Sequence, residues 1–266
     1  MSKLFSLDGR IALVTGGSRG IGRMIAAGFL QHGATVYISS RKAAACDATV
    51  AELSGLGPCH ALPADVSTAA GIAALAAAYS ARESRLDIRV NNAGAAWGAP
   101  FDEFPEAGWD KVVDLNLKSP FFLTQALHAQ LKAGAARDGE GRNGEGRNGR
   151  PAKVINIASI DGQTVNPMET YSYAASKSGL IHLSKRMALR LIEDNIVVNA
   201  ICPGAFASEM NRAARDEADA VAARIPARRI GVDDDMAAAA IYLASRAGDY
   251  VVGTTLTVDG GVNLVR

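Results

Sequence analysis

The sequence predicts an α/β fold in which one parallel sheet of about seven strands carries helices on both faces. Short apolar runs typical of buried strands alternate with longer amphipathic patterns typical of helices. The connections between them are short over most of the chain, which suits right-handed crossovers between parallel strands. We therefore expect a single doubly wound domain over residues 1–266.

A glycine-rich turn joins the first strand, expected over 10–15, to a helix that runs to His32. Strand, glycine turn and helix in this order form a Rossmann-type nucleotide site, because glycines let the backbone approach a pyrophosphate at the positive end of the helix dipole. The spacing Gly-x-x-x-Gly-x-Gly differs from the commoner Gly-x-Gly-x-x-Gly, and a glycine turn with a purely structural role is the alternative. The candidate cofactor contacts in the turn are Gly16, Ser18, Arg19, Gly20, Ile21 and Gly22.

The end of the second strand, expected over 35–39, indicates which cofactor binds. An acidic residue at this place holds the ribose 2′-hydroxyl of NAD, whereas an arginine suits the 2′-phosphate of NADP. The chain has Ser40 and Arg41 here and no acid. Arg19 in the glycine turn can reach the same phosphate with a second guanidinium. We therefore favour NADP(H) as the cofactor. The alternative is that both arginines are solvated surface cations without a role in binding.

The third strand, expected over 59–63 after a helix over 43–53, ends near two further candidate cofactor contacts, Asp65 and Val66. Asp65 either accepts a hydrogen bond from the adenine amino group or serves as an ordinary turn residue. Ser67 is expected to cap the next helix.

The fourth strand, expected over 86–90, runs into Asn91-Asn92-Ala93-Gly94, of which Asn92, Ala93 and Gly94 are candidate cofactor contacts. Arg89 is unusual in an apolar strand of a sheet that is covered on both faces. We expect it near the edge of the strand or in an ion pair.

A long helix is expected over 109–132, with Asn116 in its first half and a kink at Pro120. The tract 134–150 then repeats Gly-Glu-Gly-Arg-Asn in tandem and lacks the apolar residues needed to order itself. It joins the end of a helix to the start of a strand, which places it at the sheet edge opposite a ligand crevice. We expect a flexible loop without a catalytic role.

The fifth strand, expected over 153–158, delivers Ser159 at its carboxyl end, where α/β sheets place their chemistry. Tyr173 and Lys177 follow on a helix, four residues apart, so their side chains leave the same face. An ammonium within ~4–6 Å of a phenol lowers the phenol pKa from its usual ~10. The pair can then give a proton to a carbonyl oxygen or take one from a hydroxyl. Tyr171 is the weaker candidate, because an alanine stands four residues further on.

The last third of the chain continues the alternation of strands and helices. A sixth strand is expected over 196–202, followed by Pro203-Gly204. Residues 205–230 are polar and alanine-rich, and we expect a partly helical excursion that covers the site. A helix over 233–245 and a final strand over 255–258 complete the fold.

Taken together, these motifs resemble the short-chain dehydrogenase/reductase family over essentially the whole chain. The glycine turn resembles the family's cofactor turn, and Asn91-Asn92-Ala93-Gly94 resembles its fourth-strand motif. Family members are commonly tetramers, so the resemblance implies a homo-oligomer, either a tetramer or a dimer. The implied catalytic residues are Asn116, Ser159, Tyr173 and Lys177; Tyr173 and Lys177 also bind the cofactor, Pro203 and Gly204 line its nicotinamide, and Ser208 faces the carboxamide.

Within the family the chain is most similar to NADPH-dependent 3-oxoacyl reductases, including the type associated with rhamnolipid producers. The Ser40-Arg41 pair, the run 94–98 (Gly-Ala-Ala-Trp-Gly) and the spacing between Ser159 and Tyr173 carry this closer similarity. The implied reaction passes a hydride from NADPH to a ketone carbon while Tyr173 protonates the oxygen and Ser159 orients it. Lys177 lowers the tyrosine pKa and can reach the nicotinamide ribose hydroxyls, and Asn116 returns protons to it through a water.

The substrate is expected to be a small-molecule ketone or an acyl thioester, with Trp97, Phe101, Phe206 and Met210 as candidates for an apolar acyl pocket. The alternative within the family is a sugar or polyol dehydrogenase, which would need more hydroxyl-pairing groups in the loops 94–101 and 205–212. The alternative of another class is a nucleotide-sensing binding protein without catalysis.

Composition narrows the classes of partner. A net charge of +1 gives no support for binding nucleic acid or an anionic membrane. No apolar run approaches the ~18 residues of a membrane span, and the first ten residues lack the apolar core of a signal peptide. The three cysteines show no metal-ligand spacing, so we expect no metal and reduced thiols in a cytoplasmic protein.

Overall fold

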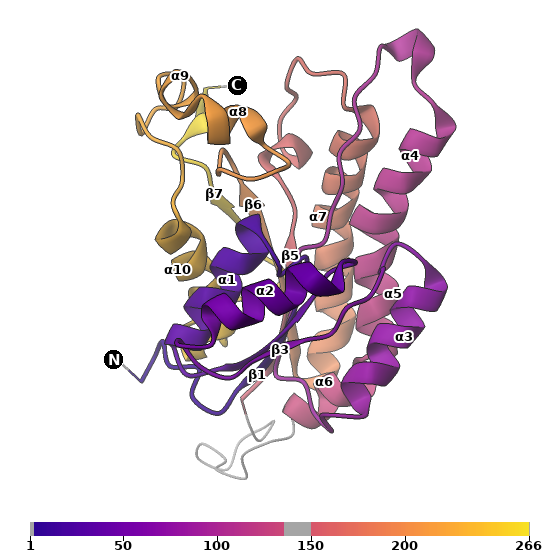
Figure 1. Ribbon diagram of the computed structural model, residues 1–266, viewed down its shortest axis with the longest axis vertical. Helices are drawn as coiled ribbons and strands as arrows, with labels where there is room; N and C mark the ends of the chain where they lie inside the picture. The colour runs from indigo at the N-terminus through magenta and orange to yellow at the C-terminus, as the bar shows by residue number, and fades with distance from the viewer. Residues whose placement is uncertain (1–2, 136–149, 266) are drawn as a thin grey trace.

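The computed structural model describes residues 3–135 and 150–265. Within these residues seven parallel strands form one sheet, in the order β3-β2-β1-β4-β5-β6-β7 (Figure 1). The expected doubly wound parallel sheet is therefore confirmed. The strands are β1 (Ile11–Thr15), β2 (Thr35–Ser39), β3 (Cys59–Ala61), β4 (Ile88–Asn91), β5 (Ala152–Ile157), β6 (Ile196–Pro203) and β7 (Thr255–Val258).

Helices cover both faces of the sheet (Figure 1). Three helices pack through one apolar core on one face: α1 (Gly20–Gln31), α2 (Ala43–Leu53) and α10 (Asp233–Ala244). A second core on the other face joins α3 (Ala69–Ser80), α5 (Ser119–Ala126), α6 (His128–Ala135) and α7 (Tyr171–Leu191). The helix α4 (Glu106–Val113) leads into this second layer.

β1 illustrates why short apolar runs become strands of a covered sheet. All five of its residues are buried. Because side chains alternate along a strand, Ala12 and Val14 enter the core under α1, whereas Ile11 and Leu13 enter the opposite core. A strand that is apolar on both faces can bury both only between two helical layers.

The expected bounds of β2, α2 and β7 agree with the structure, but the predicted cap of α3 was wrong. Thr68, not Ser67, caps this helix, and its hydroxyl accepts a hydrogen bond from the Gly71 N–H at 3.0 Å. Ser67 instead donates its backbone and side-chain hydrogens to Asp65 Oδ1, at 3.1 and 2.7 Å. Because Ser67 is bonded to Asp65, the next residue, Thr68, caps the helix, and the cap lies one residue later than predicted.

The long helix expected over 109–132 is built from several segments. A π-helical turn, Asp114–Lys118, separates α4 from α5 and carries Asn116, which is 1 % exposed. Pro120 lies in the first turn of α5, where its missing N–H leaves no hydrogen bond unmade. The helical pattern changes at the π-helical turn before Pro120, and the kink expected at Pro120 itself stays a prediction.

Arg89 does not occupy the position that we expected for it. β4 lies at the centre of the sheet, between β1 and β5, and Arg89 is fully buried there. Its NH1 donates to the carbonyl oxygens of Leu13 (3.3 Å) and Val90 (3.1 Å), and none of the described carboxylates pairs with it. The Nε and NH2 groups make no hydrogen bond. The expectation of an edge position or an ion pair was wrong.

The remaining expectations concern the parts of the chain outside the sheet. The excursion contains two short helices, α8 (Arg212–Asp216) and α9 (Ala218–Ala222), at the end of the molecule where the strands finish (Figure 1). Most of the tract 134–150, residues 136–149, lies outside the described residues. In the part of the chain that the structure describes, no helix combines the length and apolarity needed to cross a membrane.

Candidate active site

A network of hydrogen bonds joins the carboxyl ends of β1 and β4. The Thr15 hydroxyl accepts from the N–H groups of Asn92 (3.1 Å) and Ala93 (3.2 Å) and donates to the Val90 carbonyl (3.3 Å). The Asn92 side-chain amide donates in turn to the Thr15 and Gly16 carbonyls, at 2.9 and 3.1 Å. The expected fourth-strand motif therefore holds the start of the glycine turn in place.

The glycine turn leaves no room for side chains at three positions, Gly16, Gly17 and Gly22. Gly16 has a φ of +64°, and a Cβ there would lie 2.7 Å from Asn92 Nδ2. A Cβ at Gly22 would collide with the Gly16 carbonyl oxygen. No side chain caps the first turn of α1, which begins at Gly20. The turn is thus an open backbone cradle at a helix N-terminus, as expected for a phosphate site.

Two arginines flank this cradle. Arg19 and Arg41 are both exposed, and neither forms an ion pair with a described carboxylate. Ser40 lies between them and the core, with its Oγ 3.0 Å from Cys46 Sγ. The two guanidiniums therefore remain available to an anionic group from outside the chain.

Asp65 is engaged in a turn. Its hydrogen bond from the Ser67 side chain is the largest cause of a lowered pKa, and the charge of Arg41 contributes in the same direction. The Oδ1 atom takes both bonds from Ser67, so Asp65 takes part in a turn, and this role is compatible with an adenine contact through Oδ2. Val66 beside it is buried, at 5 % exposure.

Ser159 follows the carboxyl end of β5 and starts a 3₁₀ turn, Ile160–Gly162. Its Oγ accepts from the Asp161 N–H at 3.1 Å. The hydroxyl lies close enough to the phenol of Tyr173 to lower the pKa of that phenol. A Cβ at Gly162 would lie 2.6 Å from the Lys177 carbonyl carbon, so the turn packs directly on α7. This close packing brings Ser159 and Tyr173 together.

The pKa of Tyr173 departs from our expectation. Burial raises it to about 12, the hydrogen bond with Ser159 lowers it, and the negative charge of Asp161 raises it again. Lys177 is not among the causes, although its Nζ lies 5.6 Å from the ring centre. The phenol is therefore protonated at neutral pH, the form that donates a proton.

Lys177 and Asn116 complete the constellation. The Lys177 ammonium is buried and donates to the Ile157 carbonyl at 2.7 Å, and burial lowers its pKa to about 8. The Asn116 amide binds both polar backbone atoms of Ala95, at 2.8 and 2.9 Å, and donates to Ser176 Oγ at 3.1 Å. A Cβ added at Gly94 would lie 3.2 Å from Asn116 Oδ1 and 3.8 Å from Lys177 Nζ.

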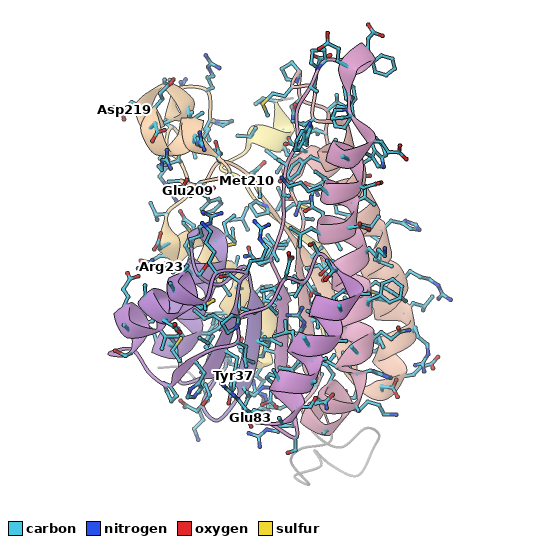
Figure 2. All side chains as sticks on the ribbon, turned by 45° about the vertical axis from the view of Figure 1, so that its right-hand side comes forward. Arg23, Tyr37, Glu83, Glu209, Met210 and Asp219 are labelled. Carbon is cyan, nitrogen blue, oxygen red and sulfur yellow. The ribbon has the colours of Figure 1, made fainter. Side chains whose placement is uncertain are left out.

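The excursion lies close to this constellation. A Cβ at Gly20 would lie 3.2 Å from that of Ser208, so the start of the excursion reaches the glycine turn. Gly204, directly after Pro203 at the end of β6, packs against Asp259. Figure 2 shows Glu209, Met210 and Asp219 together on the excursion.

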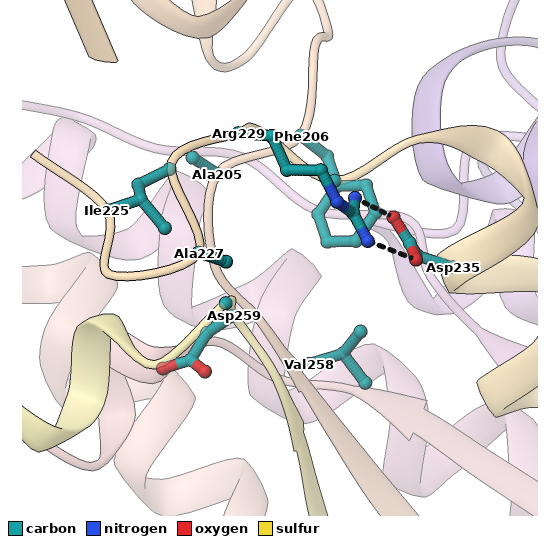
Figure 3. A pocket seen from close by; sticks show the side chains of 10 residues that line it. Ala205, Phe206, Ile225, Ala227, Arg229, Asp235, Val258 and Asp259 are labelled. Carbon is teal, nitrogen blue, oxygen red and sulfur yellow. Dashed lines mark hydrogen bonds and ion pairs between the residues drawn. The ribbon is translucent and has the colours of Figure 1, made fainter. Parts of the chain in front are cut away.

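A small pocket of about 80 Å³ lies under the base of the excursion (Figure 3). Arg229 forms a two-pronged ion pair with Asp235 of α10 at one side of it, and the Ala227 N–H donates to Gly260 at 3.0 Å. These bonds attach the end of the excursion to α10 and to the turn after β7.

The four residues expected in an acyl pocket have different surroundings. Phe206 is 3 % exposed and its ring packs on Gly231 beside the pocket of Figure 3. Trp97 packs on Gly108 with Lys111 above its ring, so it supports α4. Phe101 and Met210 are exposed, at 73 % and 51 %.

One contact near the site, made by Glu169, was not predicted from the sequence. Glu169 Oε1 accepts from the Phe101 N–H (3.2 Å) and from the Tyr171 hydroxyl (3.0 Å). The Tyr171 ring meets the rings of Phe101 and Phe104 edge to face, at 5.6 Å each. Four aromatic residues near positions 97–109 were the available signal, but their partner on α7 is not visible in a local pattern.

Known proteins are similar to the chain over nearly its whole length. Residues 16–263 match a family model described as enoyl-(acyl carrier protein) reductase. A curated relative from Pseudomonas aeruginosa, a rhamnolipids biosynthesis 3-oxoacyl-[acyl-carrier-protein] reductase, is 45% identical over 99% of this chain and 100% of its own. A gluconate 5-dehydrogenase from Gluconobacter oxydans is 34% identical over 98% of this chain and 97% of its own.

Two solved structures are also similar to the chain over nearly its whole length. The structure of Pseudomonas aeruginosa RhlG, an NADP active-site complex, superposes with a TM-score of 0.91 at 45% identity and covers 99% of this chain and all of its own. A gluconate 5-dehydrogenase from Burkholderia cenocepacia, in complex with NADP and tartrate, superposes with a TM-score of 0.86 at 34% identity and 98% coverage of both chains.

Proposed function

Because the chain belongs to the short-chain dehydrogenase/reductase family, we propose that it is an NADP(H)-dependent oxidoreductase that reduces the ketone of a 3-oxoacyl substrate. The observation that carries the proposal is the contact between Ser159 and Tyr173, with buried Lys177 one helical turn away. A hydroxyl pair of this kind can hold a carbonyl oxygen and protonate it.

The residues of the cradle fit NADP(H). The backbone approach at Gly16 and Gly22 suits a pyrophosphate. The guanidiniums of Arg19 and Arg41, which pair with no described carboxylate, suit a 2′-phosphate. Bound NADPH supplies the hydride. The residues proposed to hold it are Gly16, Ser18, Arg19, Gly20, Ile21, Gly22, Ser40, Arg41, Asp65, Val66, Asn92, Ala93, Gly94, Tyr173, Lys177, Pro203, Gly204 and Ser208.

In the proposed reduction, Tyr173 donates its phenolic proton to the ketone oxygen, and Ser159 donates a hydrogen bond to the same oxygen as negative charge develops on it. Lys177 places a positive charge beside the phenolate that remains. Asn116, fixed on Ala95, holds the chain around the ammonium and is positioned to bind the water through which Lys177 is reprotonated. The reverse reaction uses Tyr173 as base.

The alternative substrate class is a sugar or polyol, since some relatives are named as sugar dehydrogenases. Hydroxyl-rich substrates need many polar partners, but the loops 94–101 and 205–212 consist mostly of small or apolar residues. A protein that only senses nucleotide has no need of Tyr173, Lys177 or Ser159, which are all present. Both observations favour the ketone reductase.

We expect a cytoplasmic homo-oligomer, either a dimer or a tetramer. Support for an oligomer comes from Phe121 and Phe122 on α5 and Leu189 on α7, which remain 37 %, 44 % and 67 % exposed. The three buried, free cysteines suit a reducing compartment. Light scattering of the purified protein measures the oligomeric state directly.

The test of the proposed function is NADPH oxidation with ethyl 3-oxobutanoate. Tyr173→Phe should lower kcat by ~10²–10⁴-fold, the usual range for a lost acid–base group, without weakening NADPH binding. The matched control is Tyr250→Phe, because Tyr250 is fully exposed. Retained ketone reduction by the Tyr173 variant would refute the assignment.

A further inference from the structure

A row of four buried polar side chains crosses the second core. Asn91 on β4 and Asn156 on β5 are neighbours in the register of the sheet. Thr124 of α5 and Ser184 of α7 meet them from the helical layer. All four residues are at most 4 % exposed. Burying polar groups in an apolar layer costs free energy, so the row indicates a role that packing alone does not fill.

The hydroxyl of Ser184 fixes the direction of the hydrogen bond between α7 and β5. Ser184 donates its single hydrogen to the Leu180 carbonyl of its own helix at 2.7 Å, so it accepts from the Asn156 amide at 2.8 Å. The Asn156 amide oxygen accepts from the Asn91 amide at 2.7 Å. Asn156 therefore has a partner on each side, and one orientation of its amide satisfies both.

Ser184 lies on the stripe of α7 that carries the proposed acid–base pair. It follows Tyr173 by eleven residues and Lys177 by seven, so the three side chains leave similar sides of the helix. At a rise of ~1.5 Å per residue, Ser184 lies about 16 Å from Tyr173 along the helix axis. Because both residues belong to one continuous helix, a shift of α7 at Ser184 moves Tyr173 with it.

Asn156 lies on the strand that delivers Ser159, three residues before it. The residue after Asn156, Ile157, accepts the hydrogen bond from the Lys177 ammonium at 2.7 Å. Two adjacent residues of β5 thus bind α7, one through Lys177 and one through Ser184. The lysine side chain is long and flexible and can follow a helix that slides, whereas the serine hydroxyl is short. The bond to Ser184 is therefore the stiffer of these two restraints.

Apolar contacts press α7 onto the sheet but fix its position along β5 less sharply. Met187 and Ala188, which follow Ser184 on α7, pack in the second core. The hydrophobic effect has no direction, and apolar side chains of similar volume replace one another at small cost. A hydrogen bond, in contrast, weakens steeply when its distance or angle changes.

We propose that Asn156 and Ser184 are positioning residues whose hydrogen bond sets the place of α7 along β5, and with it the geometry in which Tyr173 and Ser159 hold the ketone oxygen. This inference rests on the proposed function and adds to it two residues that lie behind the reacting groups. A reacting group misplaced by ~1 Å can lower a rate by ~10²-fold. Loss of the bond should therefore lower kcat and leave NADPH binding intact.

The test is NADPH oxidation with ethyl 3-oxobutanoate by Ser184→Ala and Ser184→Thr. The alanine variant loses the acceptor, so its kcat should fall by ~10–100-fold, while NADPH binds as in the wild type. Threonine keeps a hydroxyl that can bond the carbonyl one turn back, and it should restore most of the lost kcat. A wild-type kcat in Ser184→Ala overturns the inference and leaves the proposed function standing. If the wild type itself reduces no ketone, the proposed function fails first.

Met187→Ala is the matched control, because Met187 is buried on the same side of α7 and packs in the second core. It should lower the midpoint of urea denaturation at least as much as Ser184→Ala does, yet keep kcat near the wild-type value. An equal loss of kcat in both variants would show that packing, rather than the hydrogen bond, positions the helix.

Asn156→Ala tests the other partner of the bond. If the two residues act through one interaction, the double variant with Ser184→Ala should lose little more kcat than Asn156→Ala alone. Losses that multiply would mean that the residues act separately, and this result contradicts the inference. Ser184→Ala removes a single oxygen atom, so it decides the inference even where Asn156→Ala folds poorly.

Discussion

Lys177 places its ammonium 5.6 Å from the centre of the Tyr173 ring, one turn further along the same helix. Both side chains are influenced more by burial than by each other. Burial raises the pKa of the phenol to about 12 and lowers that of the ammonium to about 8. Near neutral pH the pair therefore rests as a neutral phenol beside a charged lysine, which suits reduction of a ketone.

The pH dependence of reduction should follow Lys177. Its charged form predominates below about pH 8 and disappears above it, whereas Tyr173 stays protonated to about 12. We expect kcat/KM for the ketone to fall as the pH rises through about 8. Lys177→Arg should move this fall to higher pH, because a guanidinium keeps its proton above ~12. A profile that is the same in both proteins would assign the fall to another group.

Preference for NADPH should depend on Arg41. This side chain is exposed and pairs with no described carboxylate. Arg41→Asp removes a charge-assisted bond to the 2′-phosphate, worth ~1.5–3 kcal/mol, and adds repulsion. The KM for NADPH should therefore rise by ~10-fold or more. NADH is the internal control, since its KM should stay level or fall; a parallel rise for both cofactors would indicate damage to the turn instead.

The order of elements was predictable from sequence because it depends on local patterns. The bounds of β2 and α2 follow from an apolar run and a helical run with clear limits. The start of α3 was missed by one residue, because Asp65 and Thr68 compete to accept the hydrogen bonds near it and the sequence does not rank them. Such competition is decided by the geometry of the preceding turn.

The site was predictable as a set of residues but not as a set of contacts. Phe101 and Glu169 stand 68 residues apart, and the bond between them uses a backbone N–H, which no side-chain pattern reveals. The Trp97 ring packs on α4 at Gly108, where the lack of a side chain leaves room for it, and this contact is not visible in the local sequence. The pKa of Tyr173 was misjudged for a related reason, since burial depends on all the layers packed around the phenol.

Arg89 should destabilise the fold. Replacing a poorly compensated buried charge by an apolar side chain of similar length commonly gains 1–4 kcal/mol, so Arg89→Met should raise the free energy of unfolding by about 1–4 kcal/mol. The measurement is urea denaturation at pH 7. Arg224→Met is the control, because this exposed arginine should change stability by less than ~0.5 kcal/mol. A less stable Arg89 variant would mean that the two backbone bonds of Arg89 outweigh the cost of burial.

The difference in stability between the wild type and Arg89→Met should depend on pH in a defined direction. Burial lowers the pKa of Arg89 in the folded protein to about 9, well below that of a solvated guanidinium in the unfolded chain. Above pH 9 the unfolded chain therefore binds more protons than the folded one, and the stability of the wild type rises with pH. The gap between wild type and Arg89→Met should narrow from pH 8 toward pH 10. A gap that widens over this interval would contradict the assignment.

Thr15 should matter for both stability and cofactor affinity. Its side chain is buried, and its hydroxyl accepts the hydrogen bonds of the Asn92 and Ala93 N–H groups. Thr15→Val keeps the shape and removes the acceptor, and a buried donor left without a partner costs ~1–3 kcal/mol. The free energy of unfolding should fall by about that amount, and the dissociation constant of NADPH should rise because the glycine turn loses its anchor on β4. Thr15→Ser keeps the hydroxyl and should restore most of the affinity while leaving a small cavity. Equal losses of affinity in the valine and serine variants would show that the methyl group, not the hydrogen bonds, holds the turn.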